Sequence, residues 1–173
     1  MKVAKTSHGT FYLYFANKED LFRALTLDVS DEMAELVSSL APLTPDAAGY
    51  EALRTWLRDF TDIHTRYAPV IKAWTEAEID ESDFGRLGTE MLGGFASALA
   101  QRVAASPAEG LEPATAGLAL VALIERFHYY VLAGQVRTDD ETMLDALADI
   151  SFRALFGADA AHRATGRGRA LPR

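Results

Sequence analysis

The chain has 173 residues, of which 49% are hydrophobic and 24% are charged, so it can bury a sizeable core and lacks the composition of a disordered protein. Because it contains no cysteine, disulfides, thiolate metal sites and cysteine nucleophiles are excluded. The longest mostly apolar run is interrupted by Glu125 and Arg126 and is too short to span a bilayer. We therefore expect a soluble, cytoplasmic protein with one main domain and no membrane partner.

The formal net charge of −8 argues against broad, nonspecific binding to nucleic acid. The charge is unevenly distributed, since residues 158–173 carry four arginines and one aspartate and leave 13 basic and 24 acidic residues elsewhere. Residues 1–18 contain three lysines, one histidine and no acidic residue. A nucleic-acid contact would therefore be confined to this N-terminal segment.

Helical periodicity runs through nearly all of the chain after Asn17, and no hairpin signal separates alternating runs. Asn17 is a suitable N-cap for a long first helix, which should end before Pro42 and Pro45. A second helix is expected up to Pro69, and "VIKAWTEAEI" (70–79) favours a short third helix.

Three further helices are predicted in the second half of the chain. Ser82 is a possible cap for the first of them, and Pro113 is well placed in the first turn of the next, which contains about 20 residues and is roughly 30 Å long. The last helix is expected to open at residues 138–139 and to end at Gly157. Residues 158–173 have no periodic apolar face and should form a disordered basic tail. The predicted fold class is all-α.

The segment "SHGTFYLYFANKEDLF" (7–22) can be read in two ways. Five of the six residues in "TFYLYF" are aromatic or β-branched, which favours a strand. Ser7 is a possible helix cap, and Phe11 and Phe15 have the i, i+4 spacing of a helical pair. These local signals leave strand and helix open.

The same segment closely resembles the recognition-helix signature of the TetR family of transcriptional regulators, where Ser-x-Gly-Thr-aromatic/Leu-Tyr-x-Tyr-Phe-x-x-Lys-Glu recurs. "YAPVIKAWTEAE" and "ALIERFHYYVLAG" also resemble stretches of the family's ligand-binding domains. The resemblance implies a TetR-like helical bundle. Residues 1–18 would be the remnant of a helix-turn-helix, with its recognition helix at about 7–15, and residues 19–157 an effector-binding and dimerisation domain.

A recognition helix of this family docks in the major groove of DNA. Carried over by position, the residues implied in contacts to bases or phosphates are Ser7, His8, Gly9, Thr10, Tyr12, Tyr14 and Lys18. Family members have two further helices ahead of this one, and "MKVAKT" is at most the end of the second. Because a helix of this length is marginal alone, we expect the 173-residue chain to bind operator DNA poorly or not at all, and a version with the two preceding helices to bind it.

The middle helices carry aromatic and methionine residues that could line a pocket for a small apolar or aromatic effector, as the resemblance implies. The alternative for each residue is that it is an ordinary core residue. His64 or Glu125 could add a polar contact. The candidates are Trp56, Phe60, His64, Trp74, Met91, Phe95, Phe127 and Tyr130.

Nothing in the sequence indicates an enzyme or a cofactor. Glu125 and His128 form one Glu-x-x-His pair, whereas a di-iron bundle needs two such pairs and further glutamates. Neither a zinc-protease motif, a nucleophile elbow nor a phosphate-binding glycine loop is present. We therefore expect no metal.

The last two predicted helices carry more apolar surface than one bundle face needs. The resemblance implies that they pair with a second copy in a two-fold, four-helix interface; alternatively, they complete the core of the monomer. If these helices form the dimer interface, a Leu147→Glu change should give monomer or aggregate. The interface candidates are Leu118, Val121, Ala122, Leu147, Ile150 and Leu155.

Two functional hypotheses follow. The first is a ligand-responsive TetR-type transcriptional regulator, most simply a repressor, that binds a palindromic operator as a homodimer. The second is a stand-alone, all-α, small-molecule-binding dimer without DNA activity.

Overall fold

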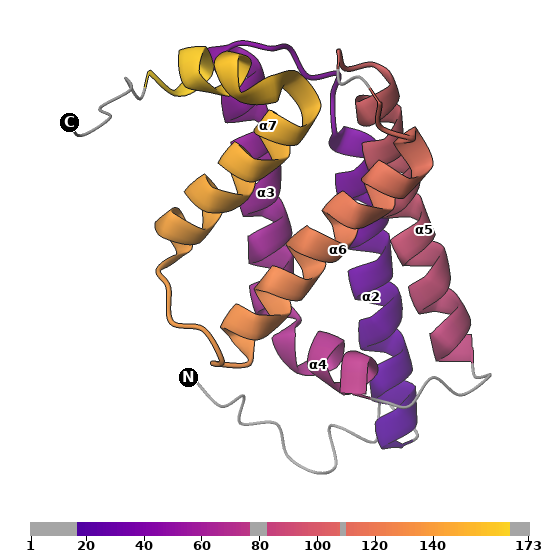
Figure 1. The fold of residues 1–173 in the computed structure, drawn as a ribbon. Helices are drawn as coiled ribbons and strands as arrows, with labels where there is room; N and C mark the ends of the chain where they lie inside the picture. Colours follow the sequence, from indigo (N-terminus) through magenta and orange to yellow (C-terminus); the bar gives the residue numbers. More distant parts are fainter. Residues whose placement is uncertain (1–16, 77–82, 108–109, 167–173) are drawn as a thin grey trace.

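The computed structural model describes residues 17–76, 83–107 and 110–166 (Figure 1). Within these ranges the chain forms six α-helices and no strand, which confirms the all-α prediction. The helices are α2 (Lys18–Ser39), α3 (Ala47–Arg66), α4 (Ala68–Glu76), α5 (Asp83–Ala104), α6 (Pro113–Leu132) and α7 (Asp140–Thr165).

Side-chain caps fix where several helices begin. The side chain of Asn17 accepts a hydrogen bond of 2.7 Å from the backbone N–H of Asp20, as its position before α2 predicts. The carboxylate of Asp139 accepts one of 2.9 Å from the N–H of Thr142 at the start of α7. Each cap satisfies a donor that the first helical turn leaves unpaired, so these starts are set by the local sequence.

The helices pack in two extended pairs, α5 with α6 and α3 with α7, and α2 lies against both α5 and α3 (Figure 1). At the first pair, a Cβ atom added to Gly117 would lie 2.5 Å from the backbone N of Ala100 and 2.6 Å from the carbonyl O of Ala96. Gly117 therefore permits an approach of α6 to α5 that a larger residue would prevent.

One apolar core joins these pairs. Its central side chains come from α2, α3 and α7 and are fully buried, among them Val29, Leu57 and Phe152. At the edge of the α3–α7 contact, the guanidinium of Arg54 pairs with Asp145 at 2.9 Å and also contacts Glu141. The core aligns α3 so that one of its faces points toward α5 and α6.

The end of α7 differs from the prediction. Gly157 does leave the helical conformation, with φ 79° and ψ 167°, but the chain resumes a helix and continues to Thr165. Ala160 and Ala161 are buried in this continuation. The expected disordered tail is therefore wrong for residues 158–165, because two alanines can pack closely without the wide apolar stripe that periodicity detects.

None of the helices in the described ranges is both long and apolar enough to cross a membrane.

Candidate ligand-binding site

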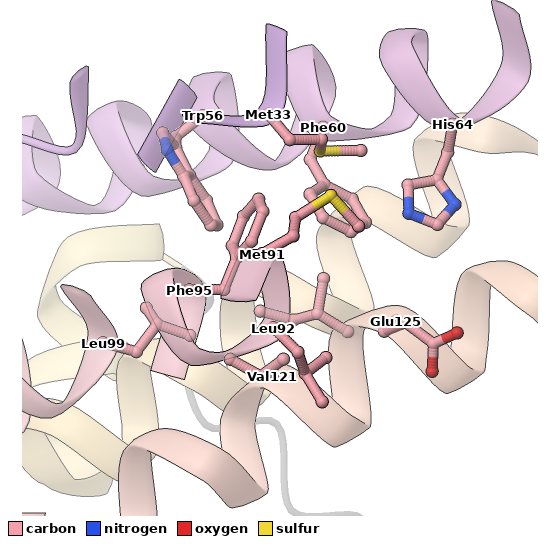
Figure 2. A pocket seen from close by; sticks show the side chains of 11 residues that line it. Met33, Trp56, Phe60, His64, Met91, Leu92, Phe95, Leu99, Val121 and Glu125 are labelled. Atoms are coloured by element: carbon pink, nitrogen blue, oxygen red, sulfur yellow. The ribbon is translucent and has the colours of Figure 1, made fainter. Parts of the chain in front are cut away.

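A cavity lies between α2, α3, α5 and α6 (Figure 2). Five of the eight predicted pocket residues line it: Trp56, Phe60 and His64 from α3, and Met91 and Phe95 from α5. The three α3 residues are spaced by four, and so are the two on α5, which places each set on one face of its helix. The other lining residues are Met33, Leu92, Leu99, Val121, Ile124 and Glu125.

The aromatic side chains of the cavity form one connected wall. The ring of Phe60 lies edge-on to Phe95 at 5.5 Å between centroids and stacks with Trp56 at 6.2 Å. The indole N–H of Trp56 donates a 2.8 Å hydrogen bond to the carbonyl oxygen of Leu36. Because this contact joins α3 to α2, it holds the indole in place and leaves its apolar face toward the cavity.

The cavity is small in this conformation. Its volume is about 40 Å³, below the hundreds of Å³ of typical sites for drug-sized ligands. Met33, Met91 and Leu92 line it, and unbranched methionine side chains adapt readily to new shapes. A second cavity of about 310 Å³, lined by α4 and the end of α6, shares His64 as a wall. A ligand larger than one ring would need the inner side chains to shift.

His64 is the most perturbed titratable group of the site. Its side chain is 4% exposed, and burial, followed by the nearby His128, lowers its pKa to about 3. The imidazole is therefore neutral at physiological pH and stacks on Phe60 at 4.3 Å. Its Nδ1 atom is buried and has no hydrogen-bond partner among the described residues. A buried polar atom left in this state is costly, and a bound molecule could satisfy it.

Glu125 supplies the only carboxylate among the lining residues that the structure describes. Burial raises its pKa above the ordinary value, and Arg126 opposes that shift. The ion pair between these two residues is long, at 3.7 Å, and the arginine side chain is about half exposed. The carboxylate is therefore only weakly compensated by the residues that the structure describes.

His128 lies behind the cavity wall and has a structural role. Its Nδ1 lies 2.7 Å from the carbonyl oxygen of Ile124, which can only accept, so Nδ1 carries the proton. In the neutral ring Nε2 is then the acceptor, and it lies 2.8 Å from the hydroxyl oxygen of Thr61. Burial lowers the pKa of His128. Within the described ranges, no three histidine or carboxylate side chains come together as metal ligands.

Three predicted pocket residues are not placed at the cavity. The side chain of Trp74 lies outside the described residues. Phe127 and Tyr130 are on α6 but do not line it. Tyr130 lies about half a turn around the helix from Val121, which lines the cavity, and is 41% exposed. Phe127 follows the lining residue Ile124 by three positions but packs on the core, so neither lines the cavity in this conformation.

The pattern of the sequence could have indicated some of the lining residues that it missed. Leu99 continues the spacing of Met91 and Phe95 along α5, so the same periodicity points to it. Met33 lies far away in sequence, and only the packing of α2 on α5 brings it to the cavity.

Comparison with known families gives a match at the N-terminus. Residues 2–25 match the family described as "Bacterial regulatory proteins, tetR family". This match at the N-terminus supports a TetR family regulator. It confirms the resemblance noted for residues 7–22, to a family of transcriptional regulators whose members generally bind DNA and dimerise and are generally not enzymes. No curated protein matches the chain.

The TetR match covers all seven predicted DNA-binding residues. Six of them, Ser7, His8, Gly9, Thr10, Tyr12 and Tyr14, lie outside the described residues. Lys18 is the first residue of α2, and its side chain is not among those that the structure describes. The match ends at residue 25, inside α2, the helix that further along contributes Met33 to the cavity.

The residues predicted for a TetR-type dimer interface fall into two groups. Leu118 and Ile150 are 49% and 50% exposed, and Ala122 is also exposed. Leu147 and Leu155 are each 1% exposed within a single chain, and Val121 is likewise buried. Because their side chains are buried, Leu147, Leu155 and Val121 cannot contribute surface to an interface in this conformation, which corrects their assignment. The helical periodicity identified apolar positions but did not show which face of the helix they occupy.

Proposed function

We propose that this TetR family protein is a ligand-responsive repressor in which a small molecule occupies the cavity between α2, α3, α5 and α6. The observation that carries the proposal is the aromatic cavity with one unpaired, buried imidazole nitrogen, that of His64. Binding sites for small molecules are typically apolar with a few polar groups that fix orientation. The packing of the described residues leaves that nitrogen unsatisfied, and a ligand would pair it.

Helix α2 offers a direct mechanical route from the cavity to the DNA-binding segment. It begins within the stretch that matches the TetR family and reaches the cavity at Met33. Fifteen residues separate Lys18 from Met33, which is about 22 Å along the helix axis. A ligand that displaces Met33 would shift α2 as a rigid rod and bias the position of the segment before it.

In the proposed complex the residues around the recognition helix hold a palindromic operator. Ser7, Gly9, Tyr14 and Lys18 would contact phosphates, while His8, Thr10 and Tyr12 would approach bases. The exposed apolar side chains of α6 and α7, Leu118, Ala122 and Ile150, would pair with those of a second copy. A two-fold dimer would then match the symmetry of the operator.

DNA selection tests the proposal. Random duplexes are enriched on the 173-residue chain, and the winners are titrated by fluorescence anisotropy at several salt concentrations. We expect an enriched palindrome, bound weakly and less tightly as salt rises. Lys18→Ala should weaken binding to all sequences alike and reduce the salt slope by about 1. If duplexes bind but the binding ignores sequence altogether, the repressor function is wrong.

A further inference from the structure

The polar groups of the cavity are gathered at one end. Figure 2 shows His64 and Glu125 together at that end, and Trp56 and Leu99 at the other. The space between them is lined by aromatic, aliphatic and methionine side chains. A ligand that fits this arrangement has an apolar body and a single polar head.

The charges at the polar end discriminate between kinds of head group. Within the described lining, Glu125 is the only charged residue, and neither lysine nor arginine is present. An anionic head would be buried beside a carboxylate, with no counter-charge among the described lining residues, which is strongly unfavourable. Lys72 lines the neighbouring outer cavity, but it is exposed, so solvent and salt screen its charge.

The imidazole at the same end is a suitable acceptor for a donating head. A neutral imidazole has one N–H donor and one bare acceptor nitrogen. With the proton of His64 on Nε2, the unpaired Nδ1 accepts. An ammonium group carries several N–H donors and can therefore contact Nδ1 and the carboxylate of Glu125 at the same time.

We propose that the cavity selects an apolar organic cation, a protonated amine on an aromatic body, with its nitrogen held between Nδ1 of His64 and the carboxylate of Glu125. The body lies against the rings of Phe60 and Phe95, after Met91 moves aside. This inference rests on the proposed ligand-binding function of the cavity. A cation at this end also benefits from attraction to the faces of nearby aromatic rings.

Three probes of the same shape and different charge test the selection. They are 2-naphthylmethylamine, 2-naphthylmethanol and 2-naphthoate, which are cationic, neutral and anionic at pH 7.4. Binding is measured by calorimetry, with the fluorescence of Trp56 as a second signal because its indole lines the cavity. We expect the amine to bind about tenfold more tightly than the alcohol, and the naphthoate to bind most weakly.

Two glutamine variants separate a local contact from the overall charge. Glu125→Gln should remove the preference for the amine and leave the affinity for the alcohol nearly unchanged. Glu51→Gln removes the same charge from an exposed position on α3 and should change neither affinity. The fold of both variants is checked by circular dichroism.

The outcomes distinguish this inference from the proposed function. If the alcohol or the naphthoate binds as tightly as the amine, or if Glu125→Gln keeps the amine preference, charge selection is refuted while ligand binding stands. If none of the three probes binds the folded wild type, this inference is refuted. If a broad panel of uncharged aromatic molecules also fails to bind, the ligand-binding function fails with it.

Discussion

Leu147 and Ile150 provide a matched pair on α7 that tests which apolar side chains belong to the core. Leu147 is 1% exposed and Ile150 is 50% exposed within one chain. Truncating a fully buried leucine to alanine removes its apolar contacts and leaves a cavity, at a cost of about 2 to 5 kcal/mol. Truncating the half-exposed isoleucine should cost a single chain about 1 kcal/mol.

The free energy of unfolding is measured by urea denaturation followed by circular dichroism. A loss of about 3 kcal/mol for Leu147→Ala would lower the Tm of a chain of this length by about 6 to 12 °C. If Ile150 lies in a dimer interface, the cost of Ile150→Ala should increase with protein concentration, because association and stability are linked. The cost of Leu147→Ala should be the same at every concentration that keeps the protein dimeric.

Two results would refute this reasoning. A loss below about 1 kcal/mol for Leu147→Ala would mean that Leu147 is not in the core of the single chain. An Ile150→Glu variant that remains dimeric in light scattering would remove the exposed face of α7 from the interface. Leu147→Glu, in contrast, should unfold the chain rather than yield a folded monomer, because it places a charge among buried apolar side chains.

Two further predictions concern helix packing and pH. Gly117→Ala should destabilise the protein by about 1 to 3 kcal/mol in urea denaturation, because its Cβ would overlap the backbone of Ala100. Gly93→Ala has no neighbour within 4 Å of its added Cβ and should be neutral or stabilising, so equal effects of the two variants would refute the close approach of α6 to α5. Burial lowers the pKa of His64 to about 3 and lowers that of His128, so the unfolded chain binds more protons than the folded one below about pH 6.5. The free energy of unfolding should therefore be largest above that pH. Toward pH 4 it should fall by up to about 1.4 kcal/mol per pH unit for each of the two histidines, and the fall should be less steep in His64→Phe. An unchanged slope in this variant would show that His64 is not buried in its neutral form.

Helix order and several helix starts could be predicted because their causes are local. Asn17 and Asp139 each accept a hydrogen bond from an N–H three residues on, so a short window of sequence contains both partners. The cavity residues Trp56, Phe60 and His64 were predicted from their aromatic character and the family resemblance, and their spacing of four places them on one helical face.

Other features depend on how distant elements pack. Periodicity marks Val121, Leu147 and Ile150 alike as apolar, but only the assembled bundle puts the first two inside and leaves the third half-exposed. Met33 reaches the cavity because α2 packs on α5. The continuation of α7 after Gly157 is held by small residues, Ala160 and Ala161, whose burial has little signature in a hydropathy pattern.

The central claim, that occupancy of the cavity controls DNA binding, is tested most directly by measuring the coupling in both directions. A ligand that quenches Trp56 is titrated with and without a saturating selected operator, and operator affinity is measured by anisotropy with and without that ligand. We predict that the ligand weakens operator binding by about 5- to 150-fold and that the operator weakens ligand binding by the same factor. Affinities that are unchanged in both titrations would contradict the account.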